Sequence, residues 1–185
     1  MRALPHPVKR RTLRPFTPSG TIAASPFSSS PAASSRDATV QDISPAPMVT
    51  AARQTRHAHS TSPLRSRLGI SDDDFAILTS GRLERAKGHH LALKVAAALG
   101  EEGYPAQVIV AGGGPDEDWL RDQAQSPGIA GRVHWLGYVP HEEMPGVYNA
   151  ADAVLMLSLH TEAFPYAVVE AMSCARPVVA SRIGG

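Results

Sequence analysis

Residues 153–180 read AVLMLSLHTEAFPYAVVEAMSCARPVVA, and this stretch predicts the fold class. It begins with an uninterrupted apolar run at 153–157 and ends with a second one at 177–180. Between them, residues 166–174 are mostly good helix formers and follow Pro165, whose missing N–H suits the first helical position. Strands that are apolar on both faces and joined by helices are typical of a doubly wound parallel sheet in an α/β fold.

The same alternation of strand and helix extends upstream of this stretch. We expect three more strands, at residues 75–79, 108–111 and 133–136. We expect three more helices, at about residues 91–99, 116–125 and 142–150. The first of these helices has apolar side chains at helical spacing, namely Leu91, Val95, Ala98 and Leu99. Ligands of such sheets bind at the carboxyl ends of the strands, so the residues that follow the strands are the candidates for function.

The distribution of charge divides the chain into two parts, although its net charge is only +1. Residues 1–62 carry eight Lys/Arg against two Asp/Glu, whereas residues 63–185 carry ten against fifteen. The first part is rich in Ser, Pro and Arg without helical or strand periodicity, and we predict that it is disordered. Its composition resembles an organelle transit peptide, but we favour a non-functional extension. The mildly acidic second part is the predicted domain, and its charge argues against a broad nucleic-acid surface.

Cysteine usage and hydropathy bear on the compartment. Cys174 is the only cysteine, so an internal disulfide is impossible, which fits a reducing compartment. No apolar run approaches the roughly 18 residues of a membrane span. The sequence therefore predicts a cytoplasmic protein without a transmembrane segment. The basic cluster Lys9-Arg10-Arg11 could still contact an anionic membrane surface.

Two glutamates eight positions apart flank the start of the last predicted helix. Glu162 lies in the loop after the strand at 153–157, and Glu170 lies inside the helix. Because helical side chains lean toward the N-terminus, Glu170 can lean back toward the helix start, near Glu162. Free N–H groups and a partial positive charge make that end a natural anion site. Two carboxylates beside an anion site would suit a phosphorylated sugar.

The loop after the first predicted strand carries two cations, Arg82 and Lys87. An arginine offers a bidentate fork to phosphate oxygens, and a lysine offers a movable point charge. Together they could neutralise a diphosphate leaving group without a metal. The alternative is that both are solvated surface charges.

A glycine-rich turn, Gly112-Gly113-Gly114-Pro115, follows the second predicted strand. It lets the backbone approach a ligand closely, but a strand-to-helix turn needs such residues anyway. No Gly-Lys-Ser/Thr follows, so this is not a Walker phosphate loop, and Asp118 departs from the dinucleotide glycine fingerprint.

The histidines do not have the spacing of a metal site, and a single cysteine cannot build a thiolate site. These residues therefore do not predict a metal site. His134 lies in a predicted strand and is expected to be structural. His160 lies two residues before Glu162, where it could hydrogen-bond a sugar hydroxyl or a phosphate or be an ordinary loop residue.

Six motifs in order resemble the donor-binding, C-terminal half of retaining GT-B glycosyltransferases, the glycosyltransferases group 1 or GT4-type family. They cover about residues 64–185. The motifs are Gly81-Arg82-Leu83 with Lys87-Gly88, Ala111-Gly112-Gly113-Gly114-Pro115, residues 133–139, residues 148–153, Ser158 with Glu162-Ala163-Phe164-Pro165 and Glu170-Ala171-Met172, and residues 177–185. The resemblance implies one Rossmann-like half of a GT-B fold. It also implies that this half binds a nucleotide-diphosphate sugar as substrate and transfers its glycosyl group with retention, without a metal or a cofactor.

The resemblance also implies roles for individual residues. Arg82 and Lys87 would hold the diphosphate and stabilise its developing charge. Glu162 would be the catalytic-site residue that faces the donor sugar, and Glu170 would bind the ribose hydroxyls. The complete expected donor-binding set, Glu162 apart, is Gly81, Arg82, Lys87, Gly113, Tyr138, His160, Ala163, Phe164, Pro165 and Glu170. Tyr138 belongs to the loop expected near the base.

The chain differs from the family pattern in sequence and in extent. Pro165 and Ala175 stand where the family usually has glycine. The family's separate acceptor-binding domain is not encoded, and the chain stops at Gly184-Gly185, so we expect a fragment whose acceptor domain or partner chain is missing. The alternative function is a non-catalytic nucleotide-sugar-binding module or an inactive fragment. Half of a dinucleotide-binding dehydrogenase is disfavoured because the glycine fingerprint is absent.

Overall fold

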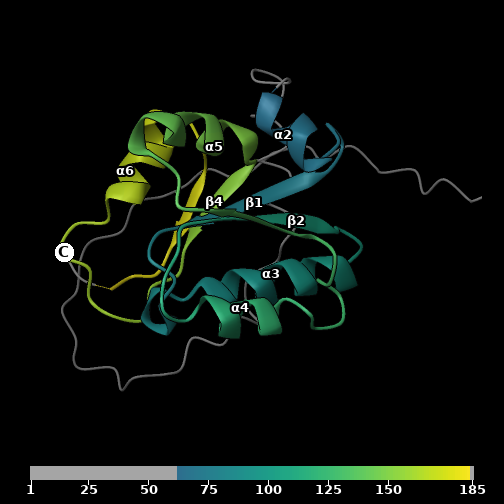
Figure 1. Ribbon diagram of the computed structural model, residues 1–185, viewed down its shortest axis with the longest axis horizontal. Coiled ribbons are helices and arrows are strands. Elements are labelled where there is room, and N and C mark those ends of the chain that lie inside the picture. The colour runs from purple at the N-terminus through teal and green to yellow at the C-terminus, as the bar shows by residue number, and fades with distance from the viewer. Residues whose placement is uncertain (1–61, 184–185) are drawn as a thin grey trace, which may run out of the picture. The chain divides into compact units, whose positions relative to one another are not determined.

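The computed structural model describes residues 62–183, so the prediction of a disordered segment at 1–62 lies outside the described residues except for Ser62. These residues contain a five-stranded sheet with helices on both faces (Figure 1). The strands are β1 Phe75–Ser80, β2 Ala106–Ala111, β3 Val133–Gly137, β4 Ala153–Met156 and β5 Val178–Ala180. Every pair of neighbouring strands is parallel. The predicted doubly wound parallel sheet is therefore confirmed.

The strand order β3-β2-β1-β4-β5 creates one reversal of direction across the sheet. The chain builds outward from β1 through β2 to β3, then returns to place β4 on the other side of β1. Ile77 and Leu78 of β1 lie in register with Ala153 and Val154 of β4. The carboxyl ends of β1 and β4 thus flank the topological switch point, where ligands bind in open α/β sheets.

Helices cover the two faces of the sheet. In Figure 1, α3 (His89–Glu101) and α4 (Glu117–Gln123) lie on one face, and α5 (Met144–Ala150) and α6 (Tyr166–Ser173) lie on the other. Two buried apolar clusters correspond to these two layers, and all of β1 is buried between them. Short 3-10 helices at Arg85–Lys87 and His141–Glu143 precede α3 and α5. None of the helices in the described range is long and apolar enough to cross a membrane.

Three details differ from the sequence-based expectations. The helix α2 (Pro63–Leu68) was not predicted, because six residues are too few to show a period. In α3 the buried face is His89, Ala92, Leu93, Ala96 and Leu99, whereas Ala98 is exposed. Because alanines occur all round this helix, hydrophobicity alone does not select the buried side. Pro165 is the N-cap of α6 rather than its first helical residue.

A buried arginine ties α2 to the amino ends of two strands. The Arg65 guanidinium donates to the carbonyls of Ala150, Ser71 and Asp74 and to Asp152 Oδ2, the last at 3.3 Å. Asp152 Oδ2 also accepts the N–H of Ala76 at 2.7 Å. Since Asp74 precedes β1 and Asp152 precedes β4, this network fixes the amino edge of the central strand pair. We call it the Arg65 network.

Candidate functional site

The loops after β1 and β4 are packed directly together at the switch point. Gly88 has φ +68°, and a Cβ atom there would overlap the carbonyl oxygen of Leu157. The N–H of Leu159 donates to the carbonyl of Ala86 at 2.7 Å. A glycine is therefore required at position 88, and its close approach holds the 3-10 helix Arg85–Lys87 against the loop that carries Glu162.

An ion pair between Lys87 and Glu162 lies across this junction. Lys87 Nζ is 2.7 Å from Glu162 Oε1, and the same oxygen accepts the Ser158 hydroxyl at 2.7 Å. The two charged side chains are 34% and 20% exposed. Donation by Lys87 and by Ser158 lowers the pKa of Glu162, so this carboxyl is an anion at neutral pH. It is suited to accept hydrogen bonds and to orient a cation rather than to act as a general acid.

The turn after β1 is held by the glycine-rich turn after β2. The N–H of Gly81 donates to Ala111 O at 2.9 Å, and the N–H of Leu83 donates to Gly113 O at 3.1 Å. Gly112 has φ +137°, and a Cβ atom there would overlap Gly81 O. The close approach that this glycine permits is thus to the neighbouring turn. Gly113 is exposed, and a Cβ atom there would meet only Glu117 Oε2, at the ordinary contact distance of 3.9 Å.

Arg82 and Lys87 have different partners although they share one loop. The Arg82 side chain is 68% exposed and forms an ion pair with Glu84 on its own turn. Lys87 is held by Glu162 on the neighbouring loop. Binding of a diphosphate by both cations would therefore require Arg82 to leave Glu84, which an exposed ion pair resists only weakly.

Glu170 and Glu162 occupy separate hydrogen-bond networks, although the sequence suggested a shared location. Glu170 Oε2 accepts the Tyr148 hydroxyl at 2.8 Å, and Glu170 Oε1 lies 3.6 Å from Nδ1 of the exposed His141. Burial and the Glu170 carboxylate raise the pKa of Tyr148, which keeps its hydroxyl protonated. Tyr148 thus anchors one oxygen of Glu170 and leaves the other near the surface. Sequence reasoning missed Tyr148 because 22 positions separate it from Glu170 and the contact joins two helices.

The remaining predicted site residues lie at the carboxyl edge and are mostly exposed. Tyr138, immediately after β3, is 84% exposed, and Phe164 is 56% exposed. The Phe164 and Tyr166 rings meet edge to face with centroids 5.1 Å apart. His160 and Ala163 are exposed, and Pro165 is half-buried. The side chains of Tyr138, Phe164 and Tyr166 therefore present aromatic surface at this edge.

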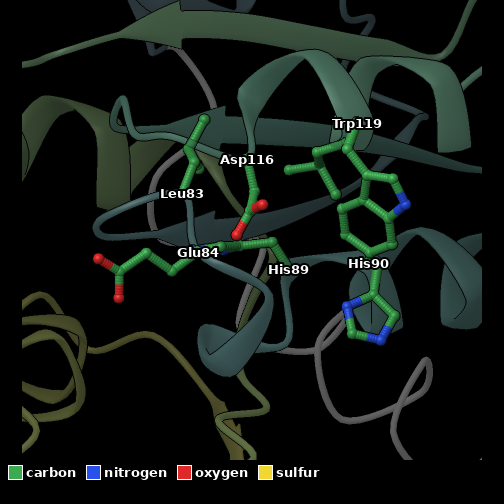
Figure 2. Close-up of a pocket in the computed structure, with 7 residues that line it drawn as sticks. Leu83, Glu84, His89, His90, Asp116 and Trp119 are labelled. Atoms are coloured by element: carbon green, nitrogen blue, oxygen red, sulfur yellow. The ribbon is translucent and has the colours of Figure 1, made fainter.

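A shallow depression lies behind the β1 turn (Figure 2). Its lining residues are Leu83, Glu84, His89, His90, Asp116, Trp119 and Leu120. The His90 ring meets the Trp119 ring edge on. The Arg85 guanidinium lies over the Trp119 ring, 4.4 Å from its centroid. Asp116 accepts the N–H of Arg85 at 2.8 Å. We interpret this region as packed support for the 3-10 helix that carries Lys87.

No group of three or more His, Cys, Asp or Glu within residues 62–183 is arranged to hold a metal ion. That transfer needs neither metal nor cofactor stays a prediction.

Comparisons with known proteins identify the family of the chain. Residues 61–185 match the family model of glycosyl transferases group 1. The D-inositol 3-phosphate glycosyltransferase of Corynebacterium urealyticum is 38% identical over 133 residues, covering 68% of this chain and 31% of the relative. The glycogen synthase of Mycobacterium tuberculosis is 34% identical over 109 residues, covering 59% and 26%.

A solved structure shows the same similarity in three dimensions. The crystal structure of Anabaena Alr3699/HepE in complex with UDP-glucose aligns with a TM-score of 0.60 and 29% identity over 70% of this chain and 37% of that one. The chain spans about a third of the length of the curated relatives it matches. Because the family model covers more than half of the chain, the chain belongs to the glycosyl transferases group 1 family.

Proposed function

We propose that the carboxyl edge of this sheet is the donor side of a glycosyltransferase, which binds a nucleotide-diphosphate sugar and transfers its glycosyl group with retention. The observation that carries this proposal is the Lys87–Glu162 ion pair at the switch point between β1 and β4. In this pair an ammonium group suited to phosphate and a carboxylate suited to sugar hydroxyls are one hydrogen bond apart, which supports the proposal. The Anabaena structures with UDP and UDP-glucose support a donor of this class.

Each charged residue then has a distinct task. Lys87 and Arg82 neutralise the diphosphate, whose charge increases as its bond to the sugar breaks, so their stabilisation is largest in the transition state. Glu162, held as an anion, accepts hydrogen bonds from hydroxyls of the donor sugar and keeps Lys87 in place. Glu170, anchored by Tyr148 through Oε2, accepts hydrogen bonds from ribose hydroxyls through its other oxygen, Oε1.

The complete reaction needs an acceptor held within reacting distance of the donor. In the GT-B arrangement that the sequence resembles, a second domain does this. We therefore propose donor binding for the chain as given, and turnover only when an acceptor domain or partner chain is supplied. Analysis of the product by NMR would then show whether the anomeric configuration is retained.

The proposal is tested by titrating the full chain with UDP-glucose, GDP-glucose and ADP-glucose by calorimetry. We expect one of them to bind and its affinity to fall roughly tenfold in Arg82→Ala and in Glu170→Ala, since each loses a hydrogen bond to a charged group. Arg67→Ala and Glu101→Ala remove exposed charges away from the carboxyl edge and are the matched controls. Binding that is unchanged in both site variants refutes the site, and no binding by the wild type refutes the function.

A further inference from the structure

His89 lies beneath the β1 turn and contacts it from the protein interior. It is the first residue of α3 and is 3% exposed, beside Leu83 and Glu84 in the depression shown in Figure 2. One ring nitrogen, Nε2, is 3.0 Å from the carbonyl oxygen of Arg82. The other, Nδ1, is 2.8 Å from the hydroxyl of Thr79, which is 2% exposed in β1.

The partners determine where the ring carries its proton. A carbonyl oxygen can only accept, so Nε2 must be the protonated nitrogen. Burial lowers the pKa of His89, which keeps the ring neutral at pH 7, and Nδ1 then accepts from Thr79. Both nitrogens of a fully buried ring are thereby used, and one of them is committed to the backbone of Arg82.

The Arg82–Leu83 peptide plane is held from both sides. Its carbonyl accepts His89 Nε2–H and, at 2.9 Å, the N–H of Glu84. Its N–H donates to Gly113 O at 3.1 Å. A peptide plane fixed at both ends sets the direction in which the exposed Arg82 side chain leaves the backbone.

We propose that His89 is a positioning residue that donates from Nε2 to the Arg82 carbonyl and so orients Arg82 toward the diphosphate of the donor. This inference rests on the proposed function, because it concerns the same donor site. His89 does not touch the donor itself. It acts through the turn Gly81–Leu83, whose order it maintains before the ligand arrives, so that less ordering is needed on binding.

Two substitutions separate the two hydrogen bonds of His89. In His89→Gln the side-chain amide nitrogen takes the place of Nε2 and can still donate to Arg82. In His89→Asn the shorter side chain can still reach the Thr79 hydroxyl but not the Arg82 carbonyl. Thr79→Val removes the other bond and leaves the bond to Arg82 in place. A purely structural role predicts equal effects of the two His89 variants once both are folded.

The test measures UDP affinity by calorimetry, and amide hydrogen exchange at Leu83 in the ligand-free chain. We expect His89→Asn to bind UDP about fivefold to tenfold more weakly and to exchange Leu83 faster. His89→Gln and Thr79→Val should stay within about threefold of the wild type. Equal affinities and equal Leu83 exchange in His89→Asn and His89→Gln would overturn the inference.

A failure of the proposed function gives a different result. If the wild type binds neither UDP nor any nucleotide sugar, the donor assignment fails. Leu83 exchange then still decides whether His89 orders the turn: faster exchange in His89→Asn alone supports that role, and equal exchange in both variants rejects it.

Discussion

The two edges of the sheet carry the same chemical pair, a cation and a carboxylate, in different surroundings. At the amino edge, Arg65 and Asp152 are 9% and 4% exposed, and the guanidinium also binds three backbone carbonyls. At the carboxyl edge, Lys87 and Glu162 are 34% and 20% exposed. A lysine ammonium has three donor hydrogens, so donation to Glu162 leaves capacity for a ligand. The two pairs therefore differ in burial and in number of partners rather than in residue type, and we propose that this difference separates a structural ion pair from one available to a ligand.

The largest expected effect is at the amino edge. Arg65→Met removes the guanidinium from Asp152 and from the strand-start carbonyls, and we expect a loss of about 3–5 kcal/mol in the free energy of unfolding. Urea denaturation measures it. Arg67→Met, an exposed arginine of the same helix, should change stability by less than about 0.5 kcal/mol. A loss below about 1 kcal/mol in Arg65→Met would break the comparison.

The next effect is at the carboxyl edge and concerns binding. Lys87→Met should lower UDP affinity roughly tenfold, because a charge-assisted hydrogen bond to phosphate is lost. Its stability should fall by less than about 1 kcal/mol, since the pair with Glu162 is partly solvated. Calorimetry and urea denaturation measure the two quantities, with the exposed Lys94→Met as control. A stability loss equal to that of Arg65→Met would show that both edges are structural.

A smaller effect is expected where a buried group supports an outer one. Tyr148→Phe removes the hydroxyl that anchors Glu170, which should cost about 1 kcal/mol of stability. It should also weaken UDP binding by about threefold, because Glu170 is no longer oriented. Urea denaturation and calorimetry report the two changes. Tyr104→Phe, which removes a hydroxyl outside both networks, should change neither, and an unchanged affinity in Tyr148→Phe would separate Glu170 from the site.

The smallest effect is expected at the entry to β5. Ala175 has φ 53°, a left-handed conformation that favours glycine. Ala175→Gly should therefore raise the free energy of unfolding by about 0.5–1 kcal/mol. The substitution relieves the backbone strain at position 175, and the greater conformational freedom of glycine in the unfolded chain offsets part of that gain. Thermal unfolding measures it, and Ala98→Gly, in an exposed position of α3, should shift stability the opposite way. Destabilisation by both glycines would contradict the assigned strain.

The fold was predictable because its strands and helices follow from local sequence patterns, and the structure confirms it. The five strands are three to six residues long, are mostly apolar and lie between turn signals, so they can be identified without knowing their neighbours. The sequence also showed that Ala175 stands where the family usually has glycine. The positive φ of Ala175 confirms that this position favours glycine. The face of α3 and the helix α2 were not predictable, because the first is alanine-rich on all sides and the second is too short.

The candidate site, too, was predictable only in part. Its position at the carboxyl edge follows from the parallel alternation of strand and helix. Arg82, Lys87 and Glu162 were predicted because they lie in loops that follow strands, and Glu170 because it can lean toward the start of its helix. Their roles toward a donor stay predictions. Their partners were not predictable, since 75 positions separate Lys87 from Glu162 and 22 separate Tyr148 from Glu170.

The amino-acid sequence alone thus specifies an α/β sheet, its family and the edge at which to look for function, because periodicity and motif order are local properties. The packing of the folded chain assigns each of these side chains its partner: Arg65 to Asp152, Lys87 to Glu162 and the neutral His89 to the Arg82 carbonyl. The physical reason is that burial and hydrogen bonding depend on which loops the strand order β3-β2-β1-β4-β5 brings together. Those quantities, and not residue identity, distinguish a stabilising group from one left available to a ligand.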